Sequence, residues 1–259
     1  MTVPVVILCG GRGTRFREQT AVRPKPMIEV CGKPILWHLM SFYAAQGFKD
    51  FILCLGYKGD SIKRYFLDYA AMTSDFTVDL SAPNSVEFHS DSVADWRVSC
   101  VGTGLDAMTG ARIKRIEPFV KGDTFLLTYG DGLSDVDVRA SVEFHRSHAG
   151  AATVTGVRPL SRFGELVTDA DNVRTFAEKP EVEHGYINGG FFVLDRKVFS
   201  YVSDDESCTF EREPLENLAG DGELMIYRHH GYWQCMDTYR DLMSLEAEWK
   251  SGRAPWRKW

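Results

Sequence analysis

Uninterrupted apolar runs alternate with amphipathic segments through the first part of the chain. Residues 3–9 (VPVVILC) and 50–57 (DFILCLGY) are apolar without alternation, which is typical of parallel strands buried on both faces. Residues 33–48 and 61–71 place their apolar side chains at helical spacing. This order of strand, loop, helix, strand and helix predicts the beginning of a doubly wound sheet with right-handed crossovers.

The hydrophobic pattern changes further along the chain. Residues 76–102 hold short alternating segments (FTVDL, VEFH, WRVSCVG), which predict antiparallel hairpins. Residues 123–132 (DTFLLTYGDG) are a further buried strand, short strands dominate from residue 160, and a helix is expected around 238–251. We therefore predict one continuous α/β domain, with a doubly wound, mostly parallel Rossmann-like sheet and a small mixed-sheet lobe in its second half.

Composition and charge exclude several classes of protein. The 259 residues are 44% hydrophobic and 25% charged, as in ordinary globular domains. A net charge of −6 argues against non-specific binding to nucleic acid or anionic membranes. No apolar run approaches the roughly 20 residues that cross a bilayer. The six scattered cysteines lack zinc-ligand spacing, which predicts reduced, mostly buried thiols and a cytoplasmic protein.

The first apolar strand ends abruptly in a loop of glycines and arginines, GGRGTRF. Gly10, Gly11 and Gly13 let backbone N–H groups approach an anion closely, and Arg15 can bind two phosphate oxygens at once. A dinucleotide fingerprint would need glycine where Phe16 stands, and no window contains the Gly-Lys-Ser/Thr of a Walker loop. The loop predicts a different kind of phosphate site, or else a tight turn with incidental arginines.

Two further charged residues are candidates for the same site. Lys25 lies between two prolines in RPKPM, so its charge is delivered to a fixed place and can return to the same phosphates as Arg15. A solvated lysine in an extended linker is the alternative. Asp131 ends the strand DTFLLTYGDG, at the edge where open α/β sheets bind ligands, although an aspartate there can also simply form a turn.

These motifs carry a family resemblance over nearly the whole chain. LCGGRGTRF followed by RPKPMIEVCGKPILWH resembles the pyrophosphorylase signature of sugar-1-phosphate nucleotidyltransferases. The segments MTGARIKR, TYGDG, RFGEL, EKP, INGGFFVL and MDT are most similar to members that transfer a cytidylyl group from CTP to glucose 1-phosphate. The resemblance implies a nucleotide-diphospho-sugar transferase fold, with a nucleotide-binding part over about 1–132 and a sugar-binding part over about 133–259.

The resemblance also implies a mechanism and its residues. A sugar-phosphate oxygen attacks the α-phosphorus in line and releases diphosphate, with Arg15, Lys25 and Asp131 as the catalytic residues. Arg15 would bind the departing phosphates and Lys25 those at the reacting centre. Hard oxygen ligands must hold the implied Mg²⁺, and the matching positions are Asp131 and Asp237. From the residues alone, Asp237 could equally be the N-cap of the last helix.

The resemblance implies two sets of binding residues. The nucleotide-binding set is Leu8, Cys9, Gly10, Gly11, Gly13, Thr14, Arg15, Lys25, Thr109, Arg112 and Gly130. The sugar-phosphate-binding set is Glu178, Lys179, Asn188 and Gly189.

Base selection stays open at this point. Thr109 and Arg112 are the expected contacts, and Arg112 could donate either to the cytosine carbonyl oxygen or to a phosphate. Use of dTTP, UTP or another sugar 1-phosphate is one alternative, and an inactive regulatory homologue is a more distant one. The expected partners are CTP, glucose 1-phosphate and further copies of the chain, with neither nucleic acid nor membrane. The resemblance implies that the product supplies CDP-linked deoxysugar synthesis, for surface polysaccharide or for a natural product.

Overall fold

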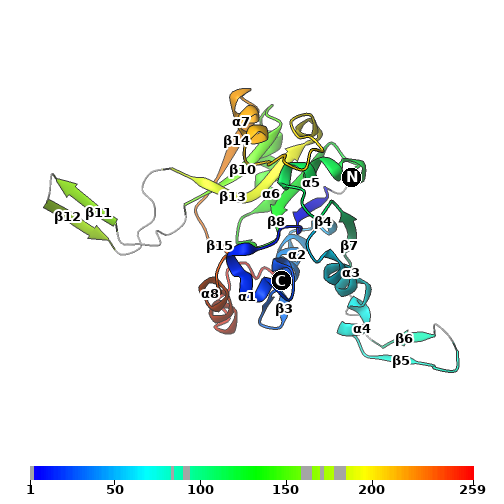
Figure 1. Cartoon of the computed structure of the whole chain (residues 1–259). Coiled ribbons are helices and arrows are strands. Elements are labelled where there is room, and N and C mark those ends of the chain that lie inside the picture. The colour runs from blue at the N-terminus through cyan, green and yellow to red at the C-terminus, as the bar shows by residue number, and fades with distance from the viewer. Residues whose placement is uncertain (1–2, 83–84, 90–93, 159–164, 170–171, 178–184) are drawn as a thin grey trace.

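A seven-stranded sheet runs through the middle of the molecule (Figure 1), in the order β14-β10-β13-β8-β1-β4-β7. The computed structural model describes residues 3–82, 85–89, 94–158, 165–169, 172–177 and 185–259. The strands of this sheet are β1 (Val5–Leu8), β4 (Asp50–Leu55), β7 (Arg97–Gly102), β8 (Thr124–Tyr129), β10 (Ala152–Val157), β13 (Ile187–Asp195) and β14 (Leu224–His229). Within the sheet, β13 alone runs against its neighbours, so the prediction of a mostly parallel sheet is confirmed.

Helices cover both faces of the sheet, as a doubly wound fold requires. Along β1, Val5 and Ile7 belong to one core cluster, whereas Val6 and Leu8 belong to the other. Successive side chains of a strand point to opposite faces, so a strand covered on both sides must be apolar throughout. The helices that pack on the first cluster are α2 (Ile35–Ala45), α3 (Gly59–Leu67), α6 (Val138–Arg146) and α8 (Tyr239–Lys250). Those that pack on the second are α5 (Thr109–Arg115), η4 (Arg196–Ser200) and α7 (Glu213–Gly220).

The order of the strands reverses between β1 and β8. The chain passes from β1 through β4 to β7 on one side and then returns to the other side of β1 with β8. Open α/β sheets bind ligands outside the carboxyl ends of the strands at such a reversal. Here those ends are followed by the glycine loop after Leu8 and by Asp131 after Tyr129.

The expected hairpins over residues 76–102 are found only in part. β5 (Phe76–Val78) and β6 (Val86–Phe88) pair as an antiparallel hairpin. β7 was expected to be antiparallel as well, but it pairs in parallel with β4. The prediction was wrong because β7 lies at the edge of the large sheet, where its side chains stay partly exposed. A half-exposed parallel strand alternates like a strand of a hairpin, so periodicity does not separate the two.

The second half contributes to the large sheet and to two small antiparallel pairs. β10, β13 and β14 join the large sheet, whereas β9 (Gly132–Ser134) pairs with β15 (Trp233–Cys235). β11 (Glu165–Asp169) and β12 (Asn172–Ala177) form a hairpin that projects from the body (Figure 1). The remaining short elements are η1 (Thr14–Phe16), α1 (Arg17–Thr20), η2 (Lys25–Met27), β2 (Glu29–Val30), β3 (Lys33–Pro34), α4 (Tyr69–Thr73) and η3 (Glu117–Phe119). Among the described residues, no helix is both long and apolar enough to cross a membrane.

Candidate active site

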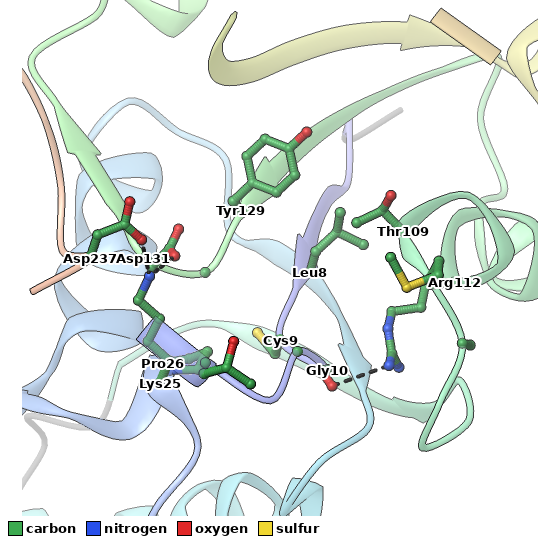
Figure 2. A pocket seen from close by; sticks show the side chains of 16 residues that line it. Leu8, Cys9, Gly10, Lys25, Pro26, Thr109, Arg112, Tyr129, Asp131 and Asp237 are labelled. Carbon is green, nitrogen blue, oxygen red and sulfur yellow. Dashed lines mark hydrogen bonds and ion pairs between the residues drawn. The ribbon is translucent and has the colours of Figure 1, made fainter. Parts of the chain in front are cut away.

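A cavity of about 500 Å³ lies at the carboxyl ends of β1 and β8, where the strand order reverses (Figure 2). Both predicted metal ligands, Asp131 and Asp237, line it. The members of the predicted nucleotide set that line it are Leu8, Cys9, Gly10, Gly11, Gly13, Thr14, Lys25, Thr109, Arg112 and Gly130. The side chain of Arg15 lies outside the part of the chain that the structure describes, so its expected phosphate contact stays a prediction.

The glycine loop presents unused backbone donors to this cavity. The amides of Gly10, Gly11 and Gly13 make no hydrogen bond with another described residue. Gly13 has a φ of +61°, and a Cβ atom there would come within 2.7 Å of Thr20. The position therefore needs glycine both for its backbone conformation and for space. An anion in the cavity can accept hydrogen bonds from these amides.

The guanidinium group of Arg112 is hydrogen bonded mainly to backbone carbonyl groups. Its side chain is buried, and burial lowers the pKa of the guanidinium from its ordinary value. Its terminal nitrogens donate to the carbonyl oxygens of Gly10, Leu55, Gly104 and Leu105 and to the hydroxyl of Thr103, at 2.7–3.3 Å. Arg112 thus ties the glycine loop to the ends of β4 and β7. Its expected contact with base or phosphate stays a prediction.

Lys25 lies between the two predicted metal ligands (Figure 2). Its Nζ is 2.5 Å from Oδ2 of Asp131 and 2.7 Å from Oδ1 of Asp237. The side chain is only 11% exposed, so Lys25 is not a solvated linker residue. Burial alone would lower the pKa of Lys25, but Asp131 and Asp237 outweigh it and the pKa lies above its ordinary value. The ammonium is therefore charged and held in one place.

A short antiparallel pair brings Asp131 and Asp237 together. Gly132 of β9 pairs with Cys235 of β15, and the amide of Met236 donates to the carbonyl oxygen of Asp131 at 2.9 Å. Asp131 directly precedes β9, and Asp237 follows β15 by two residues. The register of this pair therefore sets how far apart the two carboxylates lie.

Asp237 is not the N-cap of the last helix. Thr238 occupies that position, and its side chain accepts from the amide of Asp241 while the Asp241 carboxylate accepts from the amide of Thr238. This reciprocal capping box satisfies the first donors of α8 without Asp237. The Asp237 carboxylate is therefore left to face Lys25 and Asp131.

The donor set fits a hard divalent cation. Asp131, Cys235 and Asp237 each offer a ligand atom, and these atoms lie within 4.8 Å of one another. Burial and then the two carboxylates raise the pKa of the Cys235 thiol, which disfavours the thiolate that soft metals prefer. The Lys25 ammonium already shows that the space between the carboxylates accepts positive charge. Mg²⁺ is commonly held by one or two carboxylates together with substrate phosphates.

The described residues of the predicted sugar set lie beside the end of β8. The side chain of Asn188 lies close to the hydroxyl of Tyr129, and its Oδ1 accepts from the amide of Gly190 at 2.8 Å. The carbonyl oxygen of Gly189 accepts from the indole of Trp233 at 2.7 Å. Glu178 and Lys179 lie outside the described residues. The strand β13 thus places Asn188 next to the cavity that the nucleotide set lines.

Sequence reasoning did not single out Tyr129 or Glu211. Tyr129 ends β8 and lines the cavity, and its hydroxyl donates to the Glu211 carboxylate. Burial and then Glu211 raise the pKa of Tyr129, so its hydroxyl keeps its proton. Tyr129 could have been noticed because it directly precedes the GDG turn. Glu211 has no such signal, since one acidic residue in EREPLENL is indistinguishable from the surface charges of a helix.

Comparisons with known proteins agree in fold and in sequence. The nucleotidyl transferase family model matches residues 4–251. The chain is 50% identical to glucose-1-phosphate cytidylyltransferase of Salmonella typhi, over 98% of both chains. It is 45% identical to the probable glucose-1-phosphate cytidylyltransferase of Bacillus subtilis, over 98% of this chain and 99% of that one. HddC from Yersinia pseudotuberculosis superimposes with a TM-score of 0.69 at 25% identity, covering 96% of this chain and all (100%) of that one.

Proposed function

The chain belongs to the nucleotidyl transferase family, and we propose that it makes CDP-glucose and diphosphate from CTP and glucose 1-phosphate. The main observation in favour of this reaction is the position of the Lys25 ammonium. It forms ion pairs with both Asp131 and Asp237 in a cavity beside a glycine loop. The choice of CTP and glucose 1-phosphate is supported by 50% identity to glucose-1-phosphate cytidylyltransferase of Salmonella typhi over 98% of the chain.

The proposed reaction is a direct displacement at the α-phosphorus. An oxygen of the sugar phosphate forms a bond to the α-phosphorus. The bond between the α-phosphorus and the oxygen that bridges it to the β-phosphorus breaks. The electron pair leaves with diphosphate, and no bond to the protein forms. Both reactants are anions, so positioning and positive charge must carry most of the rate. The amides of the glycine loop bind the triphosphate, and Lys25 neutralises charge at the reacting phosphates.

Asp131 and Asp237 would hold one Mg²⁺ in this account. When bound, the ion supplies positive charge at the α-phosphate and at the sugar phosphate. The protein keeps the two carboxylates in register through the β9–β15 pair, and Thr238 and Asp241 fix the start of α8 directly after Asp237. On this proposal Arg112 acts on the nucleotide through the glycine loop, because it fixes the Gly10 carbonyl oxygen.

Diphosphate release with matched substrate pairs tests the proposed function. CTP with glucose 1-phosphate and Mg²⁺ should give the highest kcat/KM, and the product should be CDP-glucose by mass spectrometry. The same assay with dTTP, UTP and GTP, and with mannose 1-phosphate as acceptor, covers the related nucleotidyltransferases. Greatest activity with dTTP or UTP would overturn the cytidylyl assignment. A protein that is inactive with every substrate pair would overturn the proposal that this chain is a nucleotidyltransferase enzyme.

We also propose that the chain associates with itself through the hairpin β5–β6, here named the arm. Phe76 pairs with Phe88 and Val78 with Val86, so these side chains share one face, and each is 43–46% exposed. An isolated two-stranded hairpin is marginally stable in water, and an exposed apolar face usually marks an interface. In Figure 1 the arm extends away from the body.

An apolar groove beside the arm supports a second copy as its partner. The groove has a volume of about 520 Å³ and lies between edge strand β7 and helices α3 and α4, with Phe66, Tyr69, Trp96 and Val98 in its walls. The chain thus carries both a projecting apolar face and an apolar hollow. Two copies related by a twofold axis can bury both at once.

Phe88→Lys is expected to shift the protein to a smaller species in sedimentation velocity, because the apolar face would then carry a charge. Thr77→Lys is the matched control, since Thr77 pairs with Glu87 on the polar face of the same hairpin. The control should sediment like the wild type. A wild type that is monomeric at micromolar concentration, or a Phe88→Lys variant with the wild-type coefficient, would contradict the proposal.

A further inference from the structure

The segment that ends in Glu211 packs on the start of α5. The carbonyl oxygen of Cys208 accepts from the amides of Gly110 and Ala111 at 2.9 and 3.2 Å. Phe210 is fully buried and packs edge-on against Phe192, with ring centroids 5.5 Å apart. These contacts satisfy the first donors of α5 and fix the chain that leads to Glu211. The Glu211 side chain therefore extends from a rigid part of the backbone.

The Glu211 carboxylate uses both of its oxygens on hydroxyl groups of the cavity wall. Oε2 accepts from the hydroxyl of Thr109 at 2.6 Å, and Oε1 accepts from the hydroxyl of Tyr129. The Thr109 hydroxyl in turn accepts from the amide of Phe210 at 2.9 Å. Tyr129 and Thr109 come from β8 and α5, and Figure 2 shows them on either side of Leu8. Glu211 thus links Thr109 on one wall of the cavity to Tyr129 on the other, through side-chain hydrogen bonds.

Tyr129 connects this group of hydrogen bonds with the predicted sugar side. The Tyr129 hydroxyl donates to Glu211, and the side chain of Asn188 lies close to the same hydroxyl. Tyr129 is held from the other side by Gly190, where a Cβ atom would come within 2.6 Å of the ring. Hydrogen bonds therefore join Thr109, Glu211 and Tyr129, and Asn188 of the sugar set lies next to the last of these residues.

We infer that Glu211 is a positioning residue that fixes Thr109 and Tyr129, and through Tyr129 the sugar-side Asn188, for the binding of both substrates. The inference rests on the proposed function for the identity of those substrates. A carboxylate is suited to this task, because it accepts two charge-assisted hydrogen bonds on separate oxygens. Glu211 does not line the cavity itself, so it acts through the two hydroxyl groups.

The variant Glu211→Gln keeps the size of the side chain but presents only one acceptor oxygen. Both hydroxyl groups then lose a charged acceptor, and one of them loses its acceptor altogether. The loss of one such bond corresponds to about a tenfold change in binding. We expect KM to rise at least about tenfold for CTP or for glucose 1-phosphate, while kcat changes much less, because Glu211 touches no reacting atom. The matched control is Glu216→Gln, which removes the same charge from an exposed site on α7.

Two variants that each lack one hydroxyl group separate the change in KM for glucose 1-phosphate from the change in KM for CTP. Tyr129→Phe should reproduce the change in KM for glucose 1-phosphate, and adding Glu211→Gln to it should change that KM little further. Thr109→Val should reproduce the change for CTP, and Thr109→Ser should restore it because serine keeps the hydroxyl. A merely structural role of Glu211 would instead lower the melting temperature without this division between the two substrates.

Isothermal titration calorimetry with CTP and with CDP-glucose gives a readout that needs no turnover. Glu211→Gln should weaken at least one of these affinities about tenfold relative to Glu216→Gln. Kinetic constants and affinities equal to those of Glu216→Gln would overturn the inference, even with an active wild type. A fall in kcat with unchanged KM would overturn it too. An inactive wild type would overturn the proposed function, while the CTP affinities would still decide the role of Glu211.

Discussion

Lys25→Ala is expected to lower kcat at least about a hundredfold, the scale on which removal of one preorganised charge-stabilising group acts. The Lys25 ammonium is fixed by Asp131 and Asp237 before any substrate binds, so it costs little reorganisation during the reaction. Diphosphate release under saturating CTP and glucose 1-phosphate measures the effect. Lys250→Ala is the control, because Lys250 is an exposed lysine that pairs with Glu246 on the surface of α8.

A second readout separates this effect from loss of the fold. Without the ammonium, the carboxylates of Asp131 and Asp237 face each other with no charge between them, and like charges at close range repel. Mg²⁺ should therefore raise the melting temperature of Lys25→Ala more than that of the wild type. Activity within a few-fold of the wild type would remove Lys25 from the reacting centre. A variant that is unfolded with and without Mg²⁺ would assign Lys25 to stability instead.

Asp131→Asn is expected to abolish the Mg²⁺-dependent part of turnover, a loss of at least about a hundredfold. Asparagine keeps the shape of the side chain and can still accept a hydrogen bond from Lys25, but it lacks the charge that binds a divalent cation. The measurement is the rate of diphosphate release as Mg²⁺ is titrated. Asp60→Asn provides the control, since Asp60 is 93% exposed on α3.

The partner carboxylate gives an internal check on this prediction. If Asp131 and Asp237 hold one ion, Asp237→Asn should cause a similar loss, and the double variant should be little worse than either single one. An Asp131→Asn protein that retains the wild-type response to Mg²⁺ would exclude Asp131 from the metal site.

The part of the fold that surrounds the cavity could be predicted because its signals are local. β1 and β4 are buried on both faces, and uninterrupted apolar runs are the signature of such strands. The glycine loop follows β1 directly, and Asp131 follows β8 directly, so a motif at each strand end located the cavity. For β7 the same periodicity gave the wrong orientation, because an edge strand exposes one side whichever way it runs.

The remaining features depend on contacts between distant segments. β9 and β15 have three residues each, too few to show a period, yet their pairing decides where Asp237 lies. The N-cap of α8 was open to better prediction, since Thr238 with Asp241 three residues later has the spacing of a capping box. Nothing in the local sequence distinguishes Arg112 as a buried donor to four carbonyl groups, because its acceptors come from the ends of several strands.

The position of a metal ion in the complex with CTP shows whether Asp131, Asp237 and the glycine loop form one active centre. Mn²⁺ can replace Mg²⁺ at oxygen sites and scatters X-rays anomalously, so diffraction from crystals grown with both locates it. We expect one anomalous peak next to Asp131, Asp237 and the α-phosphate, with the triphosphate along Gly10–Gly13 and near Lys25. Mn²⁺ bound away from either aspartate, or a triphosphate that does not touch the glycine loop, would contradict this expectation.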